Sequence, residues 1–213
     1  MLMELKPQIK FPFDWDRGIT LLQFILQKVD RKFNTMSVLK LAFFADRYHV
    51  RNHARPISFD KYYAFPFGVG GSGLKDILAC EDDYISSKES GIVKLGKYEV
   101  ELLSDNVDDS LFSKSEIRAI EFSISNFAHY AKKNDFALSD ISHAYPEWEQ
   151  YEDLFNNKKT KREDVDYRDF LKNATAENKF FKQYKLIDPF PALTPTEQEE
   201  LEAEMLEYSQ QLV

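Results

Sequence analysis

The chain has 213 residues, of which 43% are hydrophobic and 30% charged, as is ordinary for a water-soluble globular protein. Its formal net charge of −8 argues against general nucleic-acid binding, which depends mostly on Lys and Arg side chains that neutralise phosphates. A single cysteine, Cys80, excludes an intramolecular disulfide and, with no bilayer-spanning apolar run and no secretory signal, predicts a cytoplasmic protein without a membrane partner.

Two helices are predicted in the N-terminal quarter. Residues 17–31 repeat apolar side chains at helical spacing, and "KFNT" then breaks the pattern. Asn34 or Thr35 can cap a second helix over residues 36–52, which is apolar on almost every side. A helix that is apolar all round is normally buried all round, so we place the second helix at the centre of the domain.

Strands and a glycine cluster follow. The aromatic run "SFDKYYAFPF" predicts a strand, and residues 91–103 predict a hairpin with a turn near Gly96. The intervening "GVGGSG" lacks the Lys-Ser/Thr of a phosphate-binding loop, so we interpret these glycines as a tight strand-to-helix turn. The alternative is that the backbone N–H groups at the start of the following helix hold an anion. A short helix is predicted after these glycines, over residues 74–82.

The C-terminal half is predicted to be helical. Ser113 and Glu116 form a capping box, and Thr194, Pro195 and Glu197 mark another helix start. The last helix carries six Glu and no Lys or Arg, which leaves the rest of the chain close to neutral. The predicted helices cover residues 113–132, 138–144, 146–155, 167–174, 176–187 and 195–211.

These patterns predict an α+β fold that is mainly helical. We expect a central buried helix within a helical bundle, a small antiparallel sheet or hairpin, and a C-terminal helical extension. No internal repeat accompanies them.

The search for catalytic chemistry finds little. His49 and His53 lie four residues apart with Asp46 just before them, which can make half a metal site, but satisfied or surface histidines explain them better. Ser142 and His143 are neighbours in sequence and do not face each other on a helix, which is poor evidence for a nucleophile and its base. We therefore expect no catalytic residue, no metal and no cofactor.

The segment "SVLKLAFFADRYHVRNHARPISFDKYYAFPFGV", residues 37–69, resembles the start of the SocA-like antitoxin domain, also called the Panacea domain. That family shows a Lys-Leu-x-x-Phe-Ala-Asp-Arg helix, a Pro-Ile pair, a Tyr-x-Ala strand and a Gly-containing turn, with a Ser-His pair and a tryptophan later. The turn departs from the family because its proline is absent. The motif residues are Lys40, Phe44, Asp46, Arg47, Pro56, Tyr63, Gly68, Ser142, His143 and Trp148.

The resemblance implies an antitoxin of a bacterial or prophage toxin–antitoxin system. Such a protein neutralises a protein toxin, encoded by an adjacent gene, by direct binding, and one branch of the family delivers its toxin to a protease. Residues 1–155 would form the antitoxin domain, and residues 156–213 a helical extension ending in the acidic helix. The alternatives are a DNA-binding regulator of its own operon, disfavoured by the near-neutral body, or a metal-dependent enzyme.

Two surfaces are candidates for partner binding. One is the acidic C-terminal helix, whose charge and apolar side chains suit a groove on a partner. The other is the face near the glycine cluster, where exposed aromatic side chains would anchor a partner. The candidate residues are Glu199, Leu201, Glu202, Met205 and Tyr208 on the helix, and Tyr62 and Phe67 on the second face.

The charged pair in the central helix is expected to organise the fold. Asp46 and Arg47 are adjacent and point in different directions, so each needs its own partner if buried. We expect Asp46 to accept a hydrogen bond from a tyrosine of "KYY" or from His49. We expect Arg47 to reach a carboxylate of the C-terminal helix or of a loop.

Overall fold

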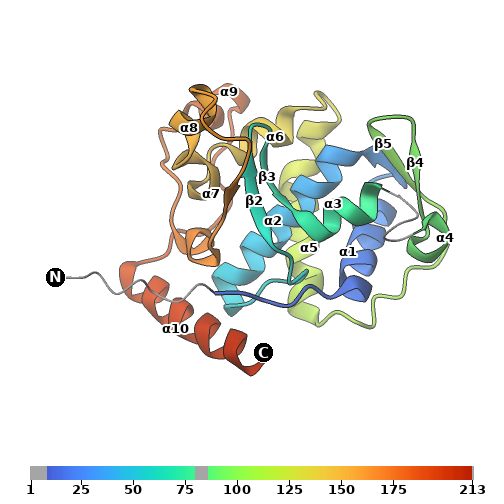
Figure 1. The fold of residues 1–213 in the computed structure, drawn as a ribbon, viewed down its shortest axis with the longest axis horizontal. Helices are drawn as coiled ribbons and strands as arrows, with labels where there is room; N and C mark the ends of the chain where they lie inside the picture. Colours follow the sequence, from blue (N-terminus) through green and yellow to red (C-terminus); the bar gives the residue numbers. More distant parts are fainter. Residues whose placement is uncertain (1–8, 80–85, 213) are drawn as a thin grey trace.

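The computed structural model describes residues 9–79 and 86–212, and helix α2, Thr35–His53, lies at its centre (Figure 1). Asn34 caps α2 by accepting a hydrogen bond from a backbone N–H of the first turn, and Ala54 ends it in the left-handed conformation, with φ of 51°. Within α2, only the last two residues are exposed. The prediction of a central helix buried on nearly all sides is confirmed.

Helices α1 (Trp15–Lys28), α5 (Lys114–Ala131) and α6 (Ala137–Ser142) pack against α2. The capping box predicted for α5 is present, with Ser113 and Glu116 bonding to each other's backbone N–H groups. These helices supply much of the apolar core around α2.

Helix α1 differs from its prediction at both ends. It begins earlier than residue 17 because the Asp14 side chain accepts a hydrogen bond from the Arg17 backbone N–H. It ends before residue 31 because Asp30 and Arg31 have positive φ values of 89° and 65°, which helical backbone does not allow.

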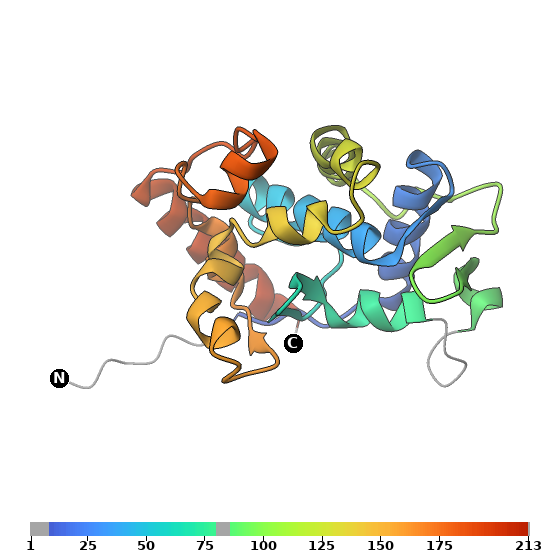
Figure 2. The same cartoon turned by 90° about the horizontal axis from the view of Figure 1, so that it is seen from above.

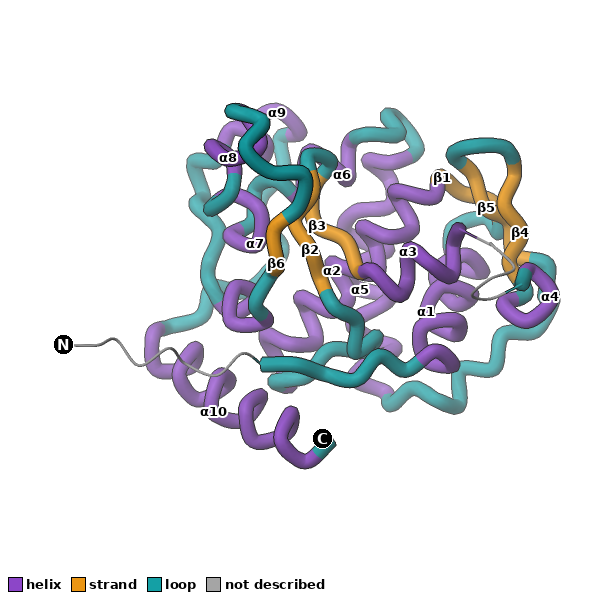
Figure 3. Tube along the Cα trace, viewed as in Figure 1, coloured by secondary structure: helices purple, strands orange, loops and turns teal. Residues whose placement is uncertain are grey.

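The first of two antiparallel sheets contains the predicted hairpin (Figure 3). Its order is β1-β5-β4, with β1 at Lys32–Asn34, β5 at Glu99–Leu102 and β4 at Ile92–Leu95. Gly96 lies in the turn with φ of 63°, which a glycine adopts without strain. Strand β1 was not predicted, because three residues are too few for an alternating pattern.

The second sheet has the order β3-β2-β6, with β3 at Gly68–Gly71, β2 at Tyr62–Phe65 and β6 at Glu163–Asp164. The interpretation of the glycine cluster as a strand-to-helix turn is wrong. Three of its glycines form β3 itself, and Pro66 and Phe67 make the turn from β2.

The glycines of β3 permit close packing. A Cβ atom at Gly68 would collide with the Ser142 hydroxyl, and one at Gly71 would collide with the Asp60 carboxylate. Asp60 accepts hydrogen bonds from the first backbone N–H groups of α3, Ser72–Ala79, so this close approach also starts the next helix. Residues 80–82 of the predicted helix, with Cys80, lie outside the described residues.

The C-terminal part folds back onto the same core. Phe170 of the 3-10 helix η1 (Tyr167–Leu171), Phe181 of α9 (Lys179–Tyr184) and Met205 of α10 (Pro195–Gln211) are all buried in it. The boundary between residues 155 and 156 stays a prediction. The remaining helical bounds are α4 Ser87–Ser90, α7 Pro146–Glu149 and α8 Glu152–Asn156.

The described residues therefore form an α+β fold that is mainly helical, as predicted, with two small antiparallel sheets. The hairpin β4–β5 and the helices α7 to α9 lie at opposite ends of the molecule in both views (Figures 1 and 2). None of the helices in the described ranges is long and apolar enough to cross a membrane.

Candidate functional site

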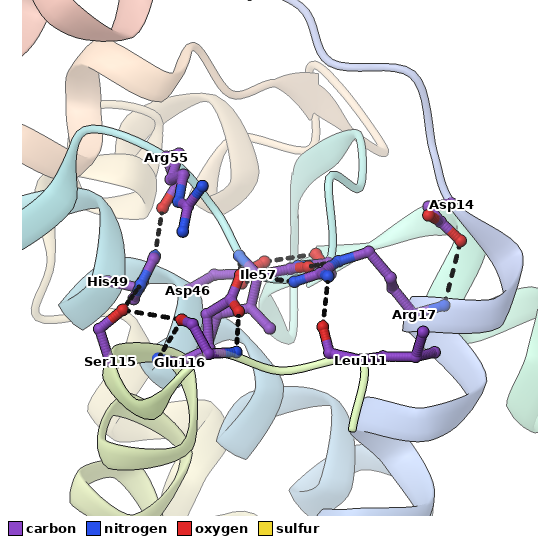
Figure 4. A network of polar contacts seen from close by, with 11 residues as sticks. Asp14, Arg17, Asp46, His49, Arg55, Ile57, Leu111, Ser115 and Glu116 are labelled. Atoms are coloured by element: carbon purple, nitrogen blue, oxygen red, sulfur yellow. Dashed lines mark hydrogen bonds and ion pairs between the residues drawn. The ribbon is translucent and has the colours of Figure 1, made fainter. Parts of the chain in front are cut away.

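Asp46, in the middle of α2, is fully buried and accepts several hydrogen bonds (Figure 4). Its carboxylate accepts from the backbone N–H groups of Ile57 and Ser58, at 2.6 and 3.1 Å. It also accepts from the Ser58 hydroxyl and, at 2.8 Å, from the Tyr62 hydroxyl. The predicted tyrosine partner is confirmed, and Asp46 ties α2 to the loop that leads into β2.

Arg17 extends this network from α1. Its guanidinium donates to the carbonyl oxygens of Ile57 and Leu111, at 3.1 and 2.8 Å, and pairs with the Glu116 carboxylate at 2.5 Å (Figure 4). One side chain therefore joins α1, the loop before β2 and the start of α5.

His49 is not a partner of Asp46. Its Nδ1 lies 2.8 Å from the Arg55 carbonyl oxygen and its Nε2 lies 3.1 Å from the Ser115 hydroxyl (Figure 4). Burial lowers the pKa of His49 to about 4, so the ring is neutral at pH 7. Both ring nitrogens are held by the protein, and no group of three or more His, Cys, Asp and Glu side chains within the described ranges is placed to hold a metal ion.

Arg47 has a different partner from the one predicted. It forms a fully buried ion pair with Glu147 of α7, and it donates to the Lys172 carbonyl oxygen at 2.8 Å. Its guanidinium also lies over the rings of Tyr145 and Phe190, with the central carbon 4.6 and 5.1 Å from their centroids. The prediction that Arg47 pairs with a carboxylate of the acidic helix or of a loop is wrong, because the chain between α6 and α7 places Glu147 beside α2.

Four side chains converge on the turn between β2 and β3. The Lys40 ammonium donates to the Val69 carbonyl oxygen, and the Ser139 hydroxyl donates to the Phe67 carbonyl oxygen, both at 2.5 Å. The Trp148 indole donates to Phe65 at 2.8 Å, and the Ser142 hydroxyl packs against Gly68. Motif residues far apart in sequence thus hold one turn in place.

Ser142 and His143 serve separate contacts. The Ser142 hydroxyl donates to the Ser139 carbonyl oxygen at 2.7 Å, while the His143 ring stacks on Trp148 with centroids 3.7 Å apart. Burial lowers the pKa of His143 to about 3. Both side chains are buried, so their arrangement supports the turn.

The remaining motif residues make contacts within the protein. Phe44 stacks on Phe127 in the core, with centroids 4.0 Å apart, and Pro56 is buried at the loop before β2. Tyr63 is 9% exposed, and the Arg162 guanidinium lies over its ring at 4.8 Å.

A groove of about 570 Å³ opens beside this turn and is mainly apolar. It lies between the start of α2, strand β3 with its turn, the β4–β5 turn and the loop between α5 and α6. Three aromatic side chains in it are strongly exposed: Phe67 at 60%, Tyr98 at 60% and Phe136 at 53%. We call this feature the aromatic groove and define it by Leu39, Lys40, Phe67, Gly70, Tyr98 and Phe136.

The two predicted partner-binding surfaces fare differently. Phe67 is exposed in the aromatic groove, whereas Tyr62 is 1% exposed because its hydroxyl is bonded to Asp46 in the core. The expectation that the Tyr62 ring lies at the surface is therefore wrong.

The apolar face of α10 packs on its own domain. Met205 is fully buried, Leu201 is half-buried, and the Tyr208 ring lies 6.3 Å from that of Phe59. A partner-binding residue has to lie at the surface, so the prediction that Met205 contacts a partner is wrong. On the polar side Glu202 pairs with Arg168 at 2.9 Å, and Glu199 is exposed.

Several important residues were missed by sequence reasoning. Glu147 stands directly after the predicted first helical residue, Pro146, where an acidic side chain looks like an ordinary N-terminal one. Tyr98 and Phe136 lie in polar connections, at "GKYE" and "KNDFA", and an aromatic residue in such a turn is the signal that points to them.

The family model described as "Antitoxin SocA-like, Panacea domain" matches residues 38–149, more than half of the chain, and this chain belongs to that family. The matched segment contains every motif residue from Lys40 to Trp148 and the three exposed aromatic residues of the groove. No curated protein and no solved structure matches the chain.

Membership places the chain broadly within toxin–antitoxin systems.

Proposed function

We propose that this protein is an antitoxin that neutralises a protein toxin, encoded by an adjacent gene, by binding it directly at the aromatic groove. The observation that carries the proposal is the set of three aromatic side chains exposed around one apolar groove. Aromatic residues are among the side chains that most often anchor a protein partner, and a contiguous exposed apolar patch marks an interaction site.

The family motif supports a binding role because Lys40 and Gly68 line this groove and other motif residues hold the turn beside it. Lys40 and Trp148 hold the turn that presents Phe67, while Asp46 fixes the loop that leads into the same sheet. Each of these contacts is internal to the protein. The motif therefore fixes the shape of the groove, and a protein that acts by binding depends on the shape of its binding surface.

The outer face of α10 remains a second candidate contact, for a basic region of the toxin. Glu199 is exposed there, together with other glutamates of the helix. Deleting α10 would remove Met205 from the core as well, so a truncation mixes folding with binding. Replacing Glu199 and Glu200 by Gln tests the charge alone.

Co-expression of this chain with each neighbouring reading frame tests the function. We expect one neighbour to stop growth when expressed alone, and growth to recover when this chain is present. The two proteins should then co-purify. A rescue without co-purification, or no toxic neighbour, would contradict direct neutralisation.

The half-life of the toxin in the same co-expressing cells distinguishes delivery to a protease from simple neutralisation. An adaptor must also bind the toxin, but it shortens the half-life of the toxin in the cell, and this shortening disappears when the protease is deleted. Simple neutralisation leaves the half-life unchanged or longer. We place both proteins in the cytoplasm of a bacterium, with a prophage as a source of the gene pair.

A further inference from the structure

The charge of the aromatic groove opposes that of the chain. Lys40, Lys75 and Lys97 line it against one acidic residue, Asp135, whereas the chain as a whole has a net charge of −8. Lys75, Lys97 and Asp135 are exposed at its rim. Complementary potentials select partners, so this local excess of positive charge favours an acidic occupant.

The Lys40 ammonium lies at the free edge of β3. Because the Ser72 N–H donates to the Lys61 carbonyl at 3.0 Å, the alternation of an antiparallel pair makes Ala64 and Val69 a pair that does not exchange hydrogen bonds. The Val69 carbonyl therefore points away from β2. β3 is the last strand of its sheet, and Lys40, whose ammonium bonds that carbonyl, is among the residues that line the groove.

Lys40 is a buried amine without a counter-charge among the described residues. It is 4% exposed, and burial is the cause that shifts its pKa, with no carboxylate contributing. An ammonium group has three N–H donors, and the Val69 carbonyl takes one. Burial lowers the pKa of Lys40 to about 7, and a carboxylate bound beside it would favour the protonated form.

Gly70 leaves space above the strand. A Cβ atom built there would meet no atom within 4 Å, unlike one at Gly68 or Gly71. Gly70 also lines the groove, together with the exposed residues Phe67 and Tyr98. A large apolar side chain of a partner can therefore lie directly over the backbone of β3.

We propose that the aromatic groove binds an acidic segment of a partner protein, with a large apolar side chain over Gly70 and an Asp or Glu carboxylate paired with Lys40. That this partner is the toxin rests on the proposed function. The apolar side chain gains contact with Phe67 and Tyr98, and the carboxylate supplies the charge that Lys40 lacks.

The probe is a library of random peptides displayed on phage and selected on the full chain. We expect enriched peptides that combine an aromatic or aliphatic residue with an Asp or Glu. The best one is synthesised with Asp or Glu, and with the matching amide. Its affinity is measured by isothermal titration against the wild type, Lys40→Met, Gly70→Val and the control Lys161→Met, whose side chain is exposed outside the groove.

The carboxylate should bind the wild type and Lys161→Met at least about tenfold more tightly than the amide. Lys40→Met should bind both peptides equally, and Gly70→Val should bind neither while keeping its melting temperature, because valine suits a strand with open space above it. Enriched peptides without acids, an undiminished preference in Lys40→Met, or binding to Gly70→Val would overturn the proposal. A wild-type dimer lost in Gly70→Val would also overturn it, by assigning the groove to a second copy.

The outcomes separate this inference from the proposed function. Peptide binding as expected, without rescue from any neighbouring gene product, would leave the groove assignment standing and remove the antitoxin role. Rescue by Gly70→Val and Lys40→Met as strong as by the wild type would keep the antitoxin role and remove the groove assignment.

Discussion

Replacing Asp46 by alanine should unfold the protein at a much lower temperature. The change leaves two buried backbone N–H groups, those of Ile57 and Ser58, without their acceptor, together with two hydroxyl groups that can rotate elsewhere. A buried donor left unsatisfied costs about 1–3 kcal/mol, so the two N–H groups alone predict a loss of about 2–6 kcal/mol. For a chain of this length, 4 kcal/mol lowers the melting temperature by about 8–16 °C.

Urea unfolding followed by circular dichroism measures this loss, provided that the wild type and Asp46→Ala have the same m-value. The matched control is Asp109→Ala, because Asp109 is exposed, and it should change stability by less than about 0.5 kcal/mol. A loss below about 1 kcal/mol for Asp46→Ala would refute the account of the Asp46 cluster. Toxin neutralisation should fall together with stability. A loss of neutralisation with unchanged stability would instead place Asp46 in the interface.

Glu147→Gln should cost about 3–5 kcal/mol of unfolding free energy in the same urea assay, because Arg47 stays buried without its counter-charge. The double variant Arg47→Met with Glu147→Leu should recover most of this loss, because it removes both buried charges. The wild type should gain stability relative to Lys40→Met as pH rises from 7 to 10, by at most about 1.4 kcal/mol per pH unit. The reason is that in this pH range the unfolded chain still binds a proton at Lys40 that the folded chain has lost. A stability difference between the two proteins that does not change with pH would contradict the lowered pKa. Gly68→Ala should lose at least about 1–3 kcal/mol through its φ of 90°, and an unchanged urea midpoint would contradict the packing at the turn. Met205→Ala should lose about 2–5 kcal/mol, whereas an exposed Met205 would lose almost nothing.

The central helix could be predicted because its signals are local. Its Asn34 cap, its apolar sides and the end of its pattern near residue 52 all lie within twenty residues, and the structure has the helix at Thr35–His53. The capping boxes of α5 and α10 were predictable for the same reason.

The glycine cluster was misread because the glycines are required by contacts with residues far away in the sequence. Gly68 and Gly71 are required by Ser142 and Asp60, and neither contact is visible from the sequence around "GVGG". Short elements were missed for a related reason, since β6 consists of two residues that become a strand only through their pairing with β2.

The candidate site was half visible from sequence. The motif marked Lys40, Asp46 and Gly68, but it did not show that Lys40 and Gly68 line one groove. The opposite wall, with Tyr98 and Phe136, comes from other elements and carries no motif, so only the three-dimensional arrangement joins it to Phe67. The acidic helix was the more visible candidate, and its apolar face turned out to be used in packing.

The affinity of the purified neighbouring toxin for Phe67→Ala, compared with Ile187→Ala, tests the central claim most directly. Both side chains are exposed, at 60% and 90%, so neither truncation should unfold the protein, and only Phe67 lines the aromatic groove. We predict a loss of about thirtyfold or more for Phe67→Ala, as expected for an interface anchor, and wild-type affinity for Ile187→Ala. Equal affinities for the two variants would contradict neutralisation through the aromatic groove.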